Sequence, residues 1–210
     1  MRNKVISVVK SVLSALFGLF IICDAYATLP AGYTEVEYIQ GDGKAWIDTG
    51  LVQTTNTNFE IQLEYTDLSD TQGVIGYLSN NVPTTNFYVA KSSNANKLLF
   101  ASGTGAQNIT NITVSANTVY TYKLNGNVLS INDSNINIQR GTLDATNTTM
   151  FIMNRGGSSN GLKGKVYYVK IWNGDTLVLD LVPVKKTVNG TDVYGMYNVL
   201  DSTPETAFYG

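Results

Sequence analysis

The sequence predicts an all-β protein, a two-sheet antiparallel β-sandwich of the jelly-roll type, preceded by a helical signal peptide. Short segments rich in Val, Ile, Thr, Tyr and Phe recur after residue 28, and stretches rich in Asn, Gly and Ser separate them. No apolar i, i+3, i+4, i+7 pattern with helix caps occurs in that part of the sequence. Many short strands joined by turns are typical of a sandwich, with a closed up-and-down barrel as the alternative.

The first 27 residues have the order of a secretory signal peptide. Basic residues come first, an apolar run covers residues 12–22, and residues 25–27 (Ala-Tyr-Ala) form a small-x-small cleavage site. The apolar run is shorter than the roughly 20 residues that span a bilayer as a helix, and a short membrane anchor is the alternative. We expect cleavage after Ala27, export to the periplasm, the cell surface or the medium, and one domain over residues 28–210.

The cysteine and histidine content restricts the chemistry. The single cysteine, Cys23, lies in the leader, so the mature chain has no disulfide and no thiol nucleophile. The chain has no histidine, which removes Ser-His-Asp and Cys-His catalysis and the commonest ligand for zinc and copper. Three basic residues and one acid leave with the leader, so the net charge changes from −2 to −4. A mildly acidic chain has no electrostatic reason to bind nucleic acid or an anionic membrane.

Two segments show the alternation of a strand most clearly. In residues 59–65 (FEIQLEY) every second side chain is apolar, which predicts one buried face and one face in water. One wet face favours antiparallel pairing. In residues 165–172 strict alternation places Tyr167 on the same face as Val169 and leaves Val166 on the opposite face.

Two Asn-Gly pairs predict tight hairpins, because Asn and Gly accept the positive φ angles that such turns require. They lie in residues 125–127 and 173–175, and each is flanked by strand-like segments. The other predicted strands are residues 35–40, 45–48, 74–77, 87–90, 98–101, 109–114, 136–138, 149–153 and 193–197.

Motifs at both ends of the mature chain point to a known family. They are residues 29–39 (LPAGYTEVEYI), 46–50 (WIDTG), 164–172 (GKVYYVKIW), 179–183 (LDLVP) and 195–198 (GMYN). Together they resemble the opening and the closing of laminin-G-like domains of the concanavalin A-like lectin/glucanase superfamily, which are frequent in bacterial surface proteins and phage structural proteins. The resemblance implies a jelly roll of two antiparallel sheets. It implies function poorly, because this scaffold carries lectins, glycosidases, adhesins and structural modules.

Residues 60–64 (EIQLE) are the sharpest candidate for catalysis. Glucanases of this superfamily carry Glu-x-Asp-x-Glu on one strand, and a retaining glycosidase needs two carboxyls about 5–5.5 Å apart, one of them protonated. The resemblance therefore makes Glu60 and Glu64 the candidate catalytic pair. Gln62 replaces the Asp between them, so the group that should tune the pair is missing. The alternative is the solvent face of an amphipathic strand, and we expect no catalytic activity.

Calcium is the one cofactor that the sequence leaves open, because laminin-G-like domains can carry a calcium ion at the rim of the sandwich. Calcium needs about 6–8 oxygen ligands from several loops. The acidic candidates are Asp42, Asp48, Asp67 and Asp70, and no Asp-x-Asp-x-Asp-Gly loop is present. The alternative is ordinary turn chemistry, in which Asp bonds to the backbone.

Aromatic residues on the outer strand faces suggest a sugar-binding surface. Lectins stack an aromatic ring on a sugar and hold its hydroxyls with polar side chains, and Tyr and Trp combine apolar area with a polar edge. By alternation Tyr88, Tyr168 and Trp172 lie opposite apolar neighbours, while Asn154 and Arg155 enter a glycine-rich loop. Packing beneath a loop is the alternative for each aromatic ring.

The sequence therefore favours a secreted, non-catalytic binding module that recognises a glycan or a glycosylated surface in the manner of a lectin. A structural or adhesive module that binds a surface protein or associates with itself is the alternative. A glycoside hydrolase is the third reading, and Gln62 argues against it.

Overall fold

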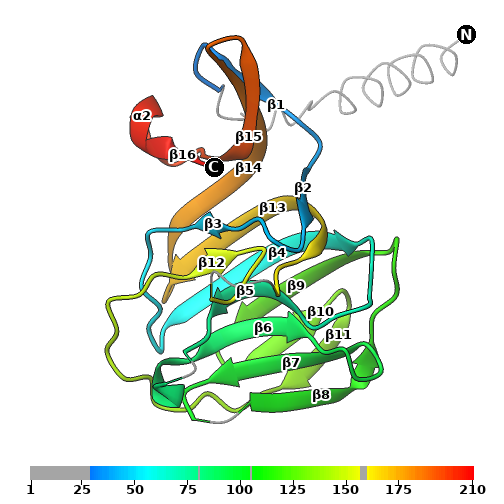
Figure 1. Cartoon of the computed structure of the whole chain (residues 1–210). Helices are drawn as coiled ribbons and strands as arrows, with labels where there is room; N and C mark the ends of the chain where they lie inside the picture. Colours follow the sequence, from blue (N-terminus) through cyan, green and yellow to red (C-terminus); the bar gives the residue numbers. More distant parts are fainter. Residues whose placement is uncertain (1–28, 80, 105, 157–159) are drawn as a thin grey trace, which may run out of the picture.

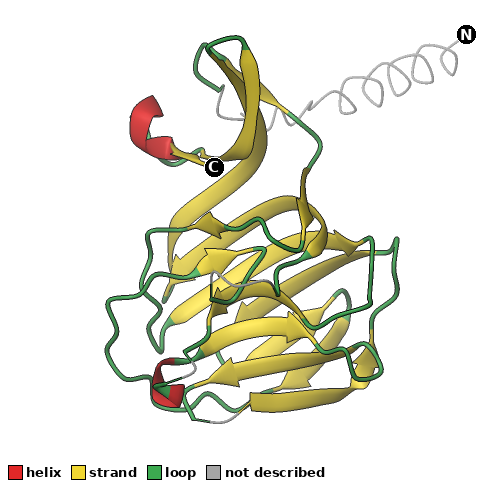
Figure 2. Cartoon of the chain, in the orientation of Figure 1, coloured by secondary structure: helices red, strands yellow, loops and turns green. Residues whose placement is uncertain are grey.

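The computed structural model describes residues 29–79, 81–104, 106–156 and 160–210. Helix in these residues is limited to η1 (Pro83–Thr85) and α2 (Pro204–Ala207), and the strand pairings are antiparallel and form two facing sheets (Figure 1 and Figure 2). The predicted antiparallel β-sandwich is thus confirmed. The predicted signal peptide and part of the glycine-rich loop after Arg155 lie outside the described residues. No helix in the described part of the chain is long and apolar enough to cross a membrane.

The larger sheet has the order β11-β10-β9-β4-β13-β14-β15-β16, with β1 beside β14 and β2 beside β13. Its strands are β1 (Tyr33–Glu35), β2 (Ile39–Asp42), β4 (Thr57–Tyr65), β9 (Val119–Asn125), β10 (Val128–Ile131), β11 (Ser134–Asn137), β13 (Lys163–Asn173), β14 (Thr176–Val188), β15 (Thr191–Asn198) and β16 (Phe208–Tyr209). The smaller sheet has the order β3-β12-β5-β6-β7-β8. Its strands are β3 (Ile47–Asp48), β12 (Phe151–Ile152), β5 (Gln72–Tyr77), β6 (Phe87–Lys91), β7 (Lys97–Ser102) and β8 (Ala106–Thr113).

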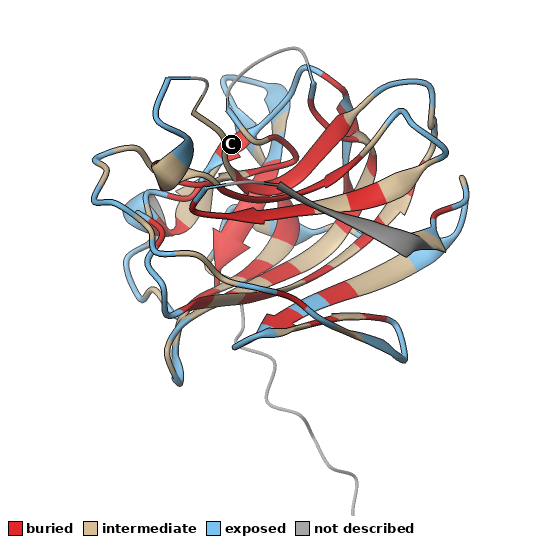
Figure 3. Cartoon of the chain, turned by 90° about the horizontal axis from the view of Figure 1, so that it is seen from below, coloured by how far each residue is buried: buried red, intermediate tan, exposed pale blue. Residues whose placement is uncertain are grey.

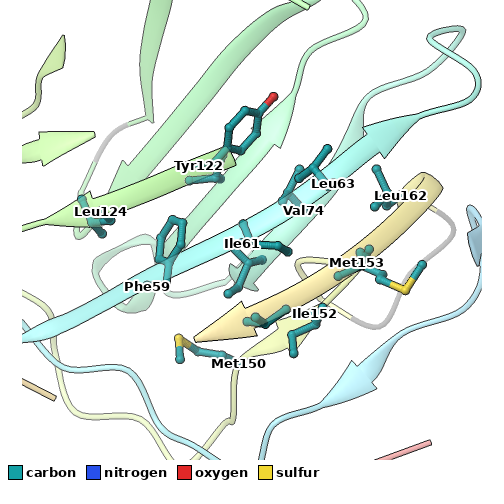
Figure 4. Packing of buried hydrophobic residues seen from close by; sticks show 14 of the residues in the cluster. Phe59, Ile61, Leu63, Val74, Tyr122, Leu124, Met150, Ile152, Met153 and Leu162 are labelled. Carbon is teal, nitrogen blue, oxygen red and sulfur yellow. The ribbon is translucent and has the colours of Figure 1, made fainter. Parts of the chain in front are cut away.

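The hydrophobic core lies between the two sheets. The alternation predicted for β4 is confirmed, and its inward side chains lie beside those of β9 in Figure 4. The ring of Phe59 meets Phe87 of β6 edge to face at 6.4 Å, and Phe87 meets Phe100 of β7 at 6.2 Å. The contact between Phe59 and Phe87 joins the two sheets, and Phe100 extends the aromatic cluster within the smaller sheet. Figure 3 shows buried residues along both layers and exposed residues at the loops.

A pair of tyrosines closes one side of this core. The hydroxyls of Tyr65 and Tyr122 lie 3.2 Å apart, and both side chains are fully buried. Burial raises the pKa of both phenols, because a phenolate would lose its hydration. Each hydroxyl therefore has a hydrogen-bond partner where water has no access.

One assignment from strict alternation is wrong. The pairing of β13 with β4 shifts register between Val166 and Tyr168, which is a β-bulge. Val166 and Val169 are consequently both buried on the inner face. Tyr167, predicted to share the face of Val169, instead points outward with Tyr168, and its hydroxyl donates to Glu64 at 2.9 Å. Side chains alternate between the two faces of a strand, so one extra residue moves every side chain beyond it to the opposite face.

Segments from both ends of the described chain form an arm beyond the sandwich (Figure 1). We define the arm as β1, residues 183–188 of β14, β15, α2 and β16. The first half of β14 pairs with β13, and its second half pairs with β1 and β15. The arm has its own small core around Val184, Tyr197 and Ala207. The single strand predicted at residues 35–40 is therefore divided, because β1 belongs to the arm and β2 pairs with β13.

Candidate functional site

The five predicted ligand-binding residues fall into two groups on different sheets. The first group is on the smaller sheet, where the Arg155 guanidinium lies 4.9 Å over the ring of Tyr88. Tyr88 is only 5% exposed. Asn154 is fully buried, and its Oδ1 accepts the backbone N–H of Arg155 at 2.6 Å and of Gly156 at 3.1 Å. The Arg155 side chain thus covers the face of the Tyr88 ring on which a sugar would stack. The three residues of this group form the packed base of a loop.

The second group lies on the outer face of the larger sheet, at positions four apart on β13. The Tyr168 hydroxyl donates to Glu60 at 2.8 Å. Trp172 is half-buried and borders a hollow at the end of the strand. Trp172 thus lies beside open space with polar groups around it.

The strand order explains why this hollow forms. β4 begins between the ends of β9 and β13, because Phe59 pairs with both Leu124 and Ile171. The turns at residues 125–127 and 173–175 therefore project from the same end of the sheet. They are two strand spacings apart, which is roughly 10 Å. Two hairpin turns that are distant in sequence thus become the two sides of one depression.

We call this depression the rim pocket. It consists of two adjoining hollows of about 430 and 240 Å³, which share Asn58, Asn125, Gly174 and Asp175. Arg140 lines the larger hollow, and Trp172 lines the smaller one. The larger hollow alone has the volume of a ligand site, and the smaller one adds a ring beside a few converging polar groups, a combination typical of such sites.

Asn58 and Arg140 hold the frame of the rim pocket. The Asn58 side chain accepts the Gly126 N–H at 3.0 Å, and its amide donates to the Gly174 carbonyl at 3.4 Å, so it bridges both turns. Arg140 donates to Asn58 Oδ1 and to the Gly126 carbonyl, each at 3.3 Å, and to the Thr57 carbonyl. Burial lowers the pKa of Arg140 from its usual value. Side chains fixed in this way give a preorganised site.

The chemistry of the rim pocket suits hydroxyl groups. Asn125 and Asn127 are exposed and offer amide donors and acceptors, and Asp175 offers a carboxylate. Asp175 is the one carboxylate among the lining residues of the two hollows, so the rim pocket lacks the acid and base pair of a glycosidase. The arrangement can bind a polar ligand with an apolar ring face.

Glu60 and Glu64, the candidate catalytic pair, each have separate partners. Lys123 contacts Glu60 at 3.0 Å, and Lys165 contacts Glu64 at 3.1 Å. Burial opposes ionisation of Glu60, but the hydrogen bonds from Lys123 and Tyr168 lower its pKa overall. The hydrogen bonds from Tyr167 and Lys165 lower the pKa of Glu64. Both carboxyls therefore stay ionised, and neither is prepared to act as the acid of a retaining mechanism.

We expect this network to make stability depend on pH at the acid end. A carboxyl whose pKa is lower in the fold than in the unfolded chain stabilises the fold above the unfolded value, about 4.3 for Glu, and this contribution is lost as the pH falls through the native pKa. Urea unfolding between pH 7 and pH 3 should show the loss in the wild type and a flatter dependence in Glu60→Gln/Glu64→Gln. The exposed Glu35→Gln is the control. Equal acid slopes in the wild type and the double variant would contradict the prediction.

The four acidic residues predicted for calcium also have other partners. Lys163 Nζ lies 2.6 Å from Asp70 Oδ2 and 3.4 Å from Asp67 Oδ2, in the position that a cation would take between them. Asp42 and Asp48 each accept a backbone N–H two residues further on, at 2.9 Å. Within the described residues no three His, Cys, Asp or Glu side chains gather as a metal site. The backbone contacts of Asp42 and Asp48 are of the kind described above as turn chemistry, whereas those of Asp67 and Asp70 with Lys163 are ion pairs.

No protein-family model matches this chain, and no curated protein is significantly similar to it. The structure itself defines the class, an antiparallel β-sandwich. The likeness to laminin-G-like domains therefore rests on the motif residues at the two ends of the chain.

Sequence reasoning missed most of the rim pocket. Asn58, Asn125, Arg140 and Asp175 were not among the predicted site residues. Both Asn-Gly turns were correctly predicted as turns, but alternation does not say which turns share one end of a sheet. The strand β4, the most strongly alternating segment, connects the two turns, because its neighbours in the sheet, β9 and β13, each end in one of them.

Proposed function

We propose that this protein is a secreted, non-catalytic, lectin-like module that binds a glycan through the rim pocket. The observation that carries the proposal is the position of Trp172 beside Asn58, Asn125 and Asp175 in one hollow. Membership in the laminin-G-like branch of the concanavalin A-like superfamily is part of this proposal. The two-sheet antiparallel sandwich supports it, together with the motifs at both ends of the chain.

The proposed mode of binding uses each wall of the rim pocket differently. The indole of Trp172 stacks on the C–H face of a sugar ring, which removes apolar surface of both partners from water. Asp175 and the amides of Asn125 and Asn127 exchange hydrogen bonds with hydroxyl groups. Because Asn58 and Arg140 already hold the two turns, little ordering of the protein opposes binding.

A glycan array with the purified protein, run with calcium and with chelator, tests the function. We expect binding to a defined set of sugars, and Trp172→Ala should weaken it at least tenfold, which corresponds to about 1.4 kcal/mol. Asp175→Asn should weaken it too, because a carboxylate accepts stronger hydrogen bonds than an amide. Asn147→Ala, an exposed position outside the rim pocket, is the matched control and should bind like the wild type.

Silence on the array from protein with a native circular dichroism spectrum would overturn the proposal. The structural or adhesive module would then become the better hypothesis, and a discrete oligomer or a captured surface protein would be the result to look for. Binding that Trp172→Ala leaves unchanged would keep a lectin function but remove it from the rim pocket.

A further inference from the structure

A second hollow lies where the arm meets the sandwich, away from the rim pocket. Its volume is about 420 Å³. β2 and the segment at residues 45–47 provide the wall on the sandwich, and Tyr194, Gly195 and Gly210 provide the wall on the arm. We call it the arm cleft.

Aromatic rings line both walls of the arm cleft. Trp46, on the sandwich side, is 47% exposed, and Tyr194, on the arm, is 57% exposed. Tyr38 is the third ring, and it is held by Lys165 Nζ at 4.8 Å over its face and by Tyr167 at a centroid distance of 5.9 Å. Single exposed apolar side chains are ordinary on protein surfaces, but rings that converge on one hollow mark a binding site.

The lining residues also restrict the charge of the ligand. None of the residues that line the arm cleft has a charged side chain. An anionic ligand would lose hydration there without gaining an ion pair, because the nearby Lys165 is already paired with Glu64. The polar side-chain groups available are the Gln40 amide and the hydroxyls of Tyr38 and Tyr194, beside a larger apolar area. An uncharged ring with apolar faces and a hydroxylated edge, such as a neutral pyranose, has the matching chemistry.

We infer that the arm cleft is a second sugar site, specific for a neutral pyranose, so that one chain carries two sites. The inference rests on the proposed function of the rim pocket. Gln40 of the arm cleft pairs with Lys165 near the start of β13, and the rim pocket adjoins Asn173 at its end. Eight residues of strand separate these points, which is roughly 26 Å. A single monosaccharide cannot occupy both sites, so one chain binds two branches or two points of one polymer and gains avidity.

The chain offers a direct way to observe the two sites separately, because it has two tryptophans and each lines a different site. Trp172→Phe leaves Trp46 as the fluorophore of the arm cleft, and Trp46→Phe leaves Trp172 as the fluorophore of the rim pocket. Both proteins are titrated with the methyl glycosides of glucose, galactose, mannose and N-acetylglucosamine, and with glucuronic acid as the charged probe.

We expect Trp46 emission to change saturably with at least one neutral glycoside and not with glucuronic acid. Tyr194→Ala, added to Trp172→Phe, should weaken this response at least fivefold. The same Tyr194→Ala, added to Trp46→Phe, should leave the Trp172 response unchanged. Val188→Ala, another exposed arm residue, is the matched control and should change neither response.

If both variants are folded, and Trp172 emission responds to a glycoside while Trp46 emission does not, the second site is overturned and the proposed function stays intact. A Trp46 response that persists in full after Tyr194→Ala would also overturn it, because the arm wall would then take no part. Two silent tryptophans would overturn both proposals. Circular dichroism and the thermal midpoint of each variant establish that it is folded.

Discussion

Phe59→Ala is expected to lower the free energy of unfolding by about 3–5 kcal/mol, the range for removing a buried phenylalanine. The ring is 1% exposed and stands at the point where β4 meets the smaller sheet, in contact with Phe87. Its loss removes apolar burial and leaves a cavity between two sheets that cannot close independently. A typical domain is stable by about 5–15 kcal/mol, so this loss is a large share. Guanidinium unfolding followed by tyrosine and tryptophan fluorescence measures it.

Val188→Ala is the control for this measurement, because Val188 is 43% exposed on the arm. It should change the free energy of unfolding by no more than about 0.5 kcal/mol. A cost below about 1 kcal/mol for Phe59→Ala would mean that the sheets do not pack through this ring.

Gly76→Ala should destabilise the protein by about 2–5 kcal/mol, because it combines backbone strain with a steric clash. Gly76 has φ +122°, and it pairs with Phe151 on one side and Tyr88 on the other. An added Cβ would lie 2.0 Å from the Phe87 carbonyl oxygen. Backbone atoms inside a sheet cannot move aside as the end of a side chain can, so β5 and β6 would have to separate. A fall in the thermal midpoint of unfolding is the measurement.

Gly190→Ala separates the two causes. Gly190 also has a positive φ of +79°, but an added Cβ there meets nothing within 4 Å. It should cost about 1–2 kcal/mol from strain alone. If both variants lose the same amount, close packing around Gly76 contributes nothing and the prediction is wrong.

Local pattern was enough to predict the fold class. The alternation of β4 indicates its antiparallel pairing as well as its faces, and the Asn-Gly pairs at 125–126 and 173–174 specify two hairpins, because both signals depend on neighbouring residues. A third pair, Asn189-Gly190, forms the turn between β14 and β15 and was not among the predicted hairpins. The β-bulge at Tyr167 was not predictable in this way. The bulge depends on the pairing of β13 with β4, which lies about a hundred residues away in the sequence. It places Tyr167 on the outer face of the sheet and Val166 on the inner face.

The candidate site was predictable only in part, for a related reason. Trp172 was recognised because its residue type and its position on a strand are both visible in the sequence. Tyr88 had the same signature, but the Arg155 guanidinium over its ring comes from a distant loop. Asn58 and Arg140 become a frame only when two turns meet, which is a property of the strand order.

The long strand β14 has a consequence for how the molecule opens. Its first residues belong to the core of the sandwich and its later residues to the small core of the arm. We expect the arm, which has the smaller core, to open first, with Met196 of β15 leaving the core of the sandwich as it does so. The reverse order is not open to the protein, because loss of the sandwich would leave β14 without the neighbour that aligns it. Amide protons of the arm should therefore exchange with water faster than those of β13, and hydrogen exchange measures this order.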